Sequence, residues 1–182
     1  MFLLAVWLLL SPALGETQGQ IIGVWFSPKG GCTEAIVQQI DAAKEEVLVQ
    51  AYNFTSQLIA DALLRAHVRG VSVQAICDRT AAGQRGCVAR DLEKAGIGVR
   101  IDAAHPIAHN KVIVLDDAVF ITGSFNFSDR AERNAENLLI LRDADLADRY
   151  HRNWQTHWDH STNLKATQTP KPHLKQEKNN EF

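Results

Sequence analysis

The sequence predicts an α/β fold in which a mixed, largely parallel β-sheet is flanked by helices on both faces. Runs rich in β-branched residues alternate along the chain with segments whose apolar residues recur at helical spacing. Two apolar runs separated only by Asp116 and Asp117 add an antiparallel hairpin to this sheet. The length of 182 residues and the apolar fraction of 46% suit one domain, expected at residues 21–160.

Each element follows from its local pattern. Strands are expected at residues 21–26, 47–54, 71–77, 97–101, 109–115, 118–122 and 138–141. Helices are expected from Thr33, from Thr55 or Ser56 as far as Gly70, over residues 88–95 and over residues 143–158. The last helix carries a stripe of large side chains, Leu146, Tyr150, Trp154 and Trp158, which indicates core packing or a subunit contact.

The two ends of the chain differ in composition from this domain. Residues 1–15 form an apolar run that ends in the small-x-small pattern Ala13-Leu14-Gly15, which is typical of a signal peptide. We therefore expect export, to the periplasm or out of the cell, with an uncleaved N-terminal anchor as the alternative. Residues 161–182 are rich in Lys, Asn, Gln, Pro and Thr, and we expect this tail to be disordered.

Composition and spacing argue against several kinds of site. A formal net charge of −2 is unlike that of a protein with an extended basic face, so any nucleic-acid contact should be local. The cysteines at 32, 77 and 87 match no zinc-ligand spacing and leave three possible disulfide pairings open. No HExxH motif or carboxylate cluster indicates a metal, and no cofactor is expected. The histidines interpreted as ordinary surface or helix residues are His67, His105, His151, His157, His160 and His173.

The predicted hairpin gathers polar side chains on one face of the sheet. Centring its turn between Asp116 and Asp117 pairs Lys111 with Thr122, and directly opposed residues share a face. The polar residues on that face are His109, Lys111, Thr122, Ser124 and Asn126. Lys supplies charge, Ser and Asn supply donors, and His can attack or shuttle a proton, so the set suits a phosphate. A change of register by one residue would separate these side chains.

The same stretch resembles the HxK(x)4D(x)6GSxN signature of the phospholipase D superfamily. His109-x-Lys111, Asp116 and Gly123-Ser124-x-Asn126 match it at every fixed position and spacing. The similarity extends over residues 25–158. It is greatest to the small, secreted, single-motif bacterial endonucleases of that superfamily, in residues 51–55, 123–127 and 154–158. The resemblance implies a phospholipase D-like fold with one motif in each chain.

The resemblance also implies a mechanism and an assembly. It implies a metal-independent phosphodiesterase that works through a phosphohistidine formed on His109. One imidazole cannot easily act as nucleophile and leaving-group acid in the same step, so two chains are expected to form a homodimer with the active site at the two-fold interface. Lys111 and Asn126 would hold the non-bridging phosphate oxygens, with Ser124 in support.

The remaining motif positions have supporting roles. Glu136 resembles the acidic residue that orients the histidine ring, and Glu132 is its rival for that role. Asp116 and Gly123 are assigned structural roles.

Three functions are compatible with the motif. The first is a sequence-nonspecific endonuclease that hydrolyses DNA, with RNA as a further substrate. The second is a phospholipase D that hydrolyses phosphatidyl head groups, and the third is a non-catalytic module that binds nucleic acid or phospholipid.

Arg79 and Arg85, in the polar loop at residues 78–86, either contact a substrate phosphate or are ordinary solvated cations.

Overall fold

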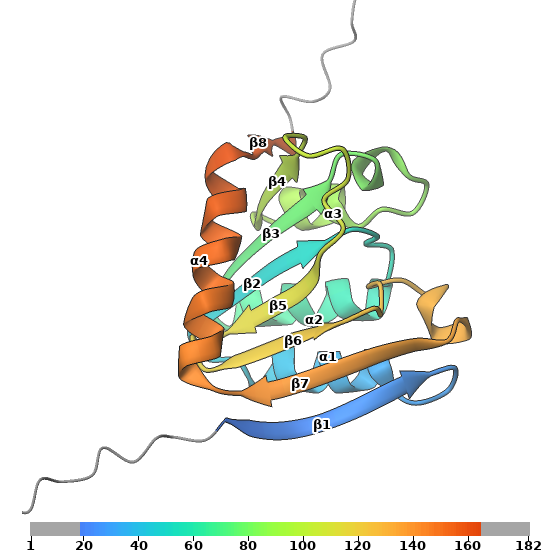
Figure 1. Ribbon diagram of the computed structural model, residues 1–182. Coiled ribbons are helices and arrows are strands. Elements are labelled where there is room, and N and C mark those ends of the chain that lie inside the picture. Colours follow the sequence, from blue (N-terminus) through green and yellow to red (C-terminus); the bar gives the residue numbers. More distant parts are fainter. Residues whose placement is uncertain (1–18, 165–182) are drawn as a thin grey trace, which may run out of the picture.

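A computed structural model describes residues 19–164, which form an eight-stranded sheet with helices on both faces (Figure 1). The strands are β1 (Gln20–Ser27), β2 (Glu46–Ala51), β3 (Ser72–Asp78), β4 (Gly98–Asp102), β5 (Lys111–Leu115), β6 (Val119–Gly123), β7 (Glu136–Arg142) and β8 (Thr162–Asn163). The helices are α1 (Cys32–Ala42), α2 (Gln57–Val68), α3 (Ala89–Lys94) and α4 (Ala144–His160), with 3₁₀ turns η1 (Ala81–Gly83) and η2 (Ala131–Arg133). The expected α/β fold is confirmed.

The parallel part of the sheet is smaller than predicted. The strand order is β1-β7-β6-β5-β2-β3-β4-β8, and only β2, β3 and β4 pair in parallel. Every other neighbouring pair among residues 19–164 is antiparallel. Helices α2 and α3 connect the adjacent parallel strands, β2 to β3 and β3 to β4, whereas β5, β6 and β7 follow one another in the chain and lie side by side as antiparallel neighbours.

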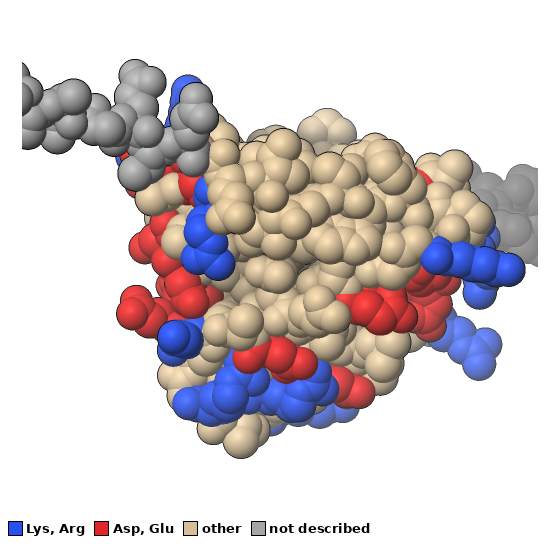
Figure 2. Space-filling model, turned by 90° about the horizontal axis from the view of Figure 1, so that it is seen from below, with Lys and Arg blue, Asp and Glu red and all other residues tan. Residues whose placement is uncertain are grey.

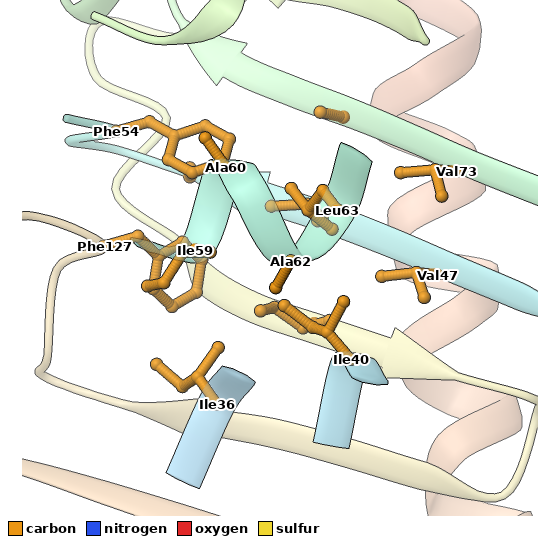
Figure 3. Close-up of a cluster of buried hydrophobic side chains, with 14 of the residues drawn as sticks. Ile36, Ile40, Val47, Phe54, Ile59, Ala60, Ala62, Leu63, Val73 and Phe127 are labelled. Carbon is orange, nitrogen blue, oxygen red and sulfur yellow. The ribbon is translucent and has the colours of Figure 1, made fainter. Parts of the chain in front are cut away.

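The larger core lies between the sheet and helices α1 and α2 (Figure 3). Helical spacing brings Ile36 and Ile40 of α1 to the same side, and Ile59 and Leu63 of α2 meet them there with no exposed surface. Burying one such side chain fully stabilises the fold by about 1.5–3 kcal/mol. Helices α1 and α2 therefore pack against one face of the central strands.

The aromatic stripe of α4 packs against the opposite face of the sheet. Trp154 is buried, its indole N–H donates to the Val49 carbonyl at 2.9 Å, and its ring stacks on Trp158 with centroids 4.9 Å apart. Tyr150 stacks on Phe120 at 4.6 Å. The stripe is therefore core packing.

Two expected helix starts have different outcomes. Ser56 caps α2 by accepting from the Ile59 amide, which is one of the two predicted caps. Gly31, with φ 76°, begins α1, and Thr33 lies inside that helix, so the prediction of Thr33 as the cap is wrong. The Thr33 hydroxyl donates instead to Glu132 at 2.5 Å.

The ordered domain extends beyond its predicted end. Thr162 and Asn163 pair with β4, and Leu164 is buried. The expectation of disorder from residue 161 is therefore wrong for residues 161–164, because this segment completes the sheet edge. The expected signal peptide at residues 1–15 and the rest of the tail lie outside the described residues. Within residues 19–164, no helix has both the length and the hydropathy of a membrane span.

All three cysteines are free thiols. Cys32 and Cys77 are buried and Cys87 is half-buried. Burial, reinforced by the negative charge of Glu132, raises the pKa of Cys32 to about 11, and burial also raises the pKa of Cys77 and Cys87. None of the three is therefore activated as a nucleophile.

Charge is mixed over the face seen in Figure 2. Lys and Arg alternate there with Asp and Glu beside a broad uncharged area, without a continuous basic stripe on that face. The edge strand β1 contains no charged residue and exposes Ile21, Val24 and Phe26.

Candidate active site

The central hairpin forms as predicted, but its register differs by one residue. Asp116 and Asp117 have φ values of 51° and 49°, and the Ala118 amide donates to the Leu115 carbonyl at 3.1 Å. Asp tolerates this left-handed backbone better than most residues. The strands then pair Leu115 with Val119, so Ala118 is an extra residue between the turn and β6.

The extra residue changes which side chains share a face. The Ala118 carbonyl accepts from the Asp143 amide at 2.9 Å, which ties it to the start of α4. Val112 consequently lies opposite Thr122 and packs beneath α4, so the neighbouring Lys111 points to the face covered by α1 and α2. The prediction that Thr122 lies opposite Lys111 and shares its face is therefore wrong, and the ladder does not pair Ser124 with His109 as that register required.

Asp116 lies at the far end of β5 from Lys111 and anchors the loop between α1 and β2. Its carboxylate accepts from the backbone amides of Lys44, Glu45 and Glu46 at 3.0, 2.9 and 3.0 Å. Partial burial alone would raise the pKa of Asp116, but these hydrogen bonds and the charge of Lys44 hold it below its ordinary value. The contacts are those of a structural residue.

His109 and Lys111 lie against the same aromatic ring, that of Tyr52. The exposed His109 ring is 4.5 Å from the Tyr52 ring, centroid to centroid. The buried Lys111 places its Nζ 5.1 Å from that ring and donates to the His109 carbonyl at 2.8 Å. Burial lowers the pKa of Lys111, and the negative charge of Glu136 opposes that shift. An imidazole open to solvent therefore stands beside a partly desolvated ammonium.

Asn126 lies beside Asn53, at the carboxyl end of β2. The two residues precede Phe54 and Phe127, which form an isolated parallel bridge with their rings edge-on at 6.1 Å (Figure 3). The same rim receives the segment before β5, because the Tyr52 amide donates to the Asn110 carbonyl at 2.9 Å. These backbone contacts bring the two halves of the motif together.

The two amides are incompletely paired. The side-chain oxygens of Asn53 and Asn126 are buried and have no hydrogen-bond partner in the described part of the chain. The side-chain nitrogens of these two residues are not among the buried unpaired atoms. An unpaired buried oxygen costs about 1–3 kcal/mol. Both nitrogens remain available as donors to a bound anion.

Gly123 and Ser124 hold the end of β6 against β7 through Asn137. The Ser124 hydroxyl accepts from the Asn137 amide at 3.0 Å, which leaves its own proton available to a ligand. A Cβ on Gly123 would lie 2.2 Å from the Asn137 carbonyl oxygen. Gly123 therefore permits the close approach of the two strands.

The two candidate acids have different surroundings. Glu132 accepts from the Thr33 amide at 2.9 Å as well as from its hydroxyl, and so fixes the start of α1. Glu136 accepts from Asn134 at 3.0 Å and faces Lys111 closely enough to affect its pKa. Among residues 19–164, no hydrogen bond joins either carboxylate to the His109 ring, which packs against the Tyr52 ring.

Sequence reasoning missed the residues that support His109. It gave no role to Tyr52, Asn53 or Asp78, although each ends or follows a buried strand at its carboxyl end, where α/β sites usually form. Asp78 is fully buried and accepts from the Ala108 amide at 2.7 Å, directly before His109.

The two loop arginines differ in their contacts. Arg79 donates to the Pro106 carbonyl at 3.2 Å and so supports the loop that leads to His109. Arg85 is exposed in the loop between η1 and α3.

The remaining histidines were interpreted as ordinary surface or helix residues; His157 and His160 do lie on helix α4, but sequence reasoning gave them and His105 no shared site. His105, His157 and His160 converge on the buried carboxylate of Asp102. His109 belongs to neither of the two groups of potential metal ligands found among residues 19–164. The histidine cluster is therefore separate from the phosphate site.

Comparisons with known proteins agree with this geometry. The model of the phospholipase D-like domain of cardiolipin synthase matches residues 36–158. The phospholipase D of Rickettsia conorii is 43% identical over 142 residues, or 78% of this chain and 71% of that protein. The mitochondrial cardiolipin hydrolase of Xenopus laevis is 31% identical over 125 residues, or 68% of this chain and 60% of that protein.

Solved structures also show similarity to a member of the phospholipase D family. Nuc from Salmonella typhimurium, a phospholipase D family member, matches with a TM-score of 0.76 and 33% identity, covering 80% of this chain and 98% of that one. NucT from Helicobacter pylori matches with a TM-score of 0.73 at 23% identity, covering 80% and 99%, which supports the fold alone.

The fold and the site define an enzyme that acts on phosphodiester bonds. The chain belongs to the phospholipase D superfamily, in which it is a phosphodiesterase.

Proposed function

We propose that the chain is a metal-independent, sequence-nonspecific endonuclease that hydrolyses DNA, and RNA as well, through a phosphohistidine. The observation that carries the proposal is the contact of His109 and Lys111 with one ring, Tyr52. His109 is exposed and can reach phosphorus, while Lys111 is held by burial and supplies fixed positive charge. Asn126 and Ser124 add neutral donors from the other half of the motif.

The proposed reaction has two steps. A nitrogen of one His109 attacks phosphorus, the bond from phosphorus to the leaving oxygen breaks, and the protonated His109 of the second chain gives that oxygen its proton. The second histidine, now neutral, takes a proton from water as the water oxygen attacks phosphorus and the phosphorus–nitrogen bond breaks. Lys111 balances the charge on the non-bridging oxygens in both steps. We assign Glu136, rather than Glu132, to orienting the His109 ring, because Glu132 accepts from Thr33 at the start of α1, whereas the negative charge of Glu136 acts on Lys111.

The homodimer that this mechanism requires is also a proposal, and the sheet limits where its axis can pass. Neighbouring strands lie about 4.8 Å apart, and β5 is the fourth strand from the β1 edge, so β5 lies about 14 Å from β1. Pairing two β1 edges would hold the two β5 strands about 34 Å apart. The axis must therefore pass beside the rim where β2 ends and β5 begins. Ile107, two residues before His109, is exposed at that rim.

Phospholipase D activity is the second candidate. It is favoured by the Rickettsia relatives, which carry that name, and by the exposed apolar side chain of Ile107. The nuclease is preferred because Nuc, at 33% identity, is matched over 98% of its length, whereas the phospholipase D of Rickettsia conorii is matched over 71%. We also propose that the protein is exported, on the pattern of residues 1–15.

The test compares substrates under identical conditions. The purified protein is incubated with plasmid DNA, with RNA and with phosphatidylcholine, each with and without EDTA, at a temperature at which the protein stays folded. We expect cleavage of nucleic acid that persists in EDTA and falls by about 10⁴-fold or more in His109→Ala. The matched control is His151→Ala, a histidine on α4 that contacts Asp117.

The outcomes separate the candidates. Release of head groups without cleavage of nucleic acid would replace the nuclease by the phospholipase. Turnover of no substrate by a folded protein that still binds them would leave the binding module. Equal activity in His109→Ala and the control would overturn the assignment of the nucleophile.

A further inference from the structure

A second cluster of ionisable side chains lies where β4 ends and α4 ends. Asp102 is the last residue of β4, His105 follows in the next loop, and His157 and His160 are one turn apart at the end of α4. The three ring nitrogens nearest to Asp102 Oδ2 are His105 Nδ1 at 3.1 Å, His157 Nδ1 at 2.8 Å and His160 Nε2 at 3.3 Å. Three histidines, one from the loop after β4 and two from the end of α4, therefore present one nitrogen each to a single carboxylate oxygen.

The separations match those of ligands around a tetrahedral zinc ion. Ligand atoms about 2.0–2.1 Å from such an ion lie about 3.3 Å from one another, and imidazole rings bound to it have centroids about 5 Å apart. Here the ring centroids lie 4.9 Å apart for His105 and His157, and 5.1 Å apart for each of the other two pairs. All four candidate donor atoms lie within 4.8 Å of one another.

The burial of the cluster also fits an ion-binding site. The Asp102 side chain is 0% exposed, and the side chains of His157, His160 and His105 are 14%, 32% and 43% exposed. The carboxylate is thus shielded from water, while the rings leave an entry path. Asp102 Oδ1 accepts from the Ala104 amide at 3.0 Å and also lies 3.2 Å from His105 Nδ1, so the amide helps to hold the carboxylate against the rings.

We propose that Asp102, His105, His157 and His160 form a structural site for a divalent transition metal ion, with Zn²⁺ as the ion the three-nitrogen, one-oxygen donor set fits. With four protein ligands the site is closed, as in structural zinc sites, and no open position remains for a substrate. The ion would join the end of α4 to the loop at residues 103–108, which leads directly into His109. Asp78 and Arg79 already hold the far end of that loop.

The second group of potential ligands does not carry the same inference. Glu46, Asp117 and His151 offer one imidazole, and the Glu46 carboxylate is 4.0 Å from it. The Asp117 side chain is 63% exposed. This group supplies a control: His151 also contacts a carboxylate and lies on α4, but outside the proposed site.

The test measures metal binding directly, without reference to catalysis. The protein is purified without a polyhistidine tag, stripped with a chelator and titrated with Zn²⁺ and with Co²⁺ in separate experiments. We expect one ion per chain, a visible Co²⁺ spectrum of tetrahedral type, and a higher unfolding temperature with Zn²⁺ than in EDTA. His105→Gln, in the loop, and His160→Gln, at the helix end, should each weaken Zn²⁺ binding by about 100-fold, and His151→Gln should leave it unchanged.

Each result bears on the proposal. If the folded wild-type protein bound Zn²⁺ no more strongly than His105→Gln and His160→Gln, the cluster would be held by hydrogen bonds alone. That result would overturn the proposed site. Because His109 is not a ligand, the metal-free protein should still cleave substrate at temperatures where it remains folded. Activity that vanished with the ion in a folded protein and returned with Zn²⁺ would overturn the structural role, and with it the metal independence of the reaction.

Discussion

Replacing Asp116 by Asn tests whether this motif residue acts through the fold. The carboxylate accepts from three backbone amides at 2.9–3.0 Å, and hydrogen bonds to a charged group contribute about 1.5–3 kcal/mol each when fully shielded. Water reaches this half-exposed loop, and Asn keeps one acceptor oxygen and tolerates the left-handed backbone. We therefore expect Asp116→Asn to lower the free energy of unfolding by about 1–2 kcal/mol at pH 7.

The pH dependence of that loss has a definite sign. The pKa of Asp116 in the folded protein lies below its ordinary value of 3.8, so its contribution is fully present above that value and is lost as the pH falls through the folded pKa. Urea unfolding of the two proteins should differ most near neutrality and converge in acid. The matched control, Asp117→Asn, should lose less than about 1 kcal/mol, because the Asp117 side chain is 63% exposed and its hydrogen bond is to His151, a half-exposed side chain, rather than to backbone amides. An Asp116→Asn variant as stable as the wild-type protein at pH 7 would refute the reasoning. So would a difference in the free energy of unfolding that persists below the folded pKa of Asp116.

Four further substitutions separate chemistry from packing. Lys111→Met should lower kcat/KM by about 10³-fold. It should change the free energy of unfolding by less than about 1 kcal/mol, because an apolar side chain fits this buried position. An unchanged kcat/KM would show that Lys111 takes no part in the reaction. Gly123→Ala should destabilise the fold by about 1–3 kcal/mol, because its Cβ would meet the Asn137 carbonyl, and urea unfolding measures this directly. Glu136→Gln should lower kcat with the fold intact, whereas Glu132→Gln should lower stability by about 1–2 kcal/mol, and the reverse pattern would exchange the two roles.

The sequence predicted the elements better than their pairing. Period and capping placed the helices and strands, because these depend on residues close together in the chain. The hairpin register depended on Ala118, which is drawn out of the ladder by a hydrogen bond from Asp143, the residue that caps α4. That contact joins the turn to a distant element, so the residues of the hairpin gave no sign of it.

The sequence predicted those residues of the candidate site that belong to the signature motif. His109, Lys111 and Asn126 follow from the spacing of the signature, and the backbone contacts bring their segments to one rim. Tyr52 and Asn53 were missed because single polar residues after a strand are common. The histidine cluster was missed because its parts lie on β4 and α4, although the spacings Asp102-x-x-His105 and His157-x-x-His160 are a signal that could have suggested it.

The most direct test of the central claim, that two chains share one catalytic centre, mixes active and inactive subunits. Wild-type protein is exchanged with His109→Ala in varied proportions at constant total concentration, and the cleavage rate is measured after exchange is complete. Because each shared centre needs a histidine from both chains, an equal mixture should retain about a quarter of the wild-type activity, falling with the square of the wild-type fraction. An equal mixture that retains about half, in linear proportion to the wild-type fraction, would show that each chain works alone and would contradict the account.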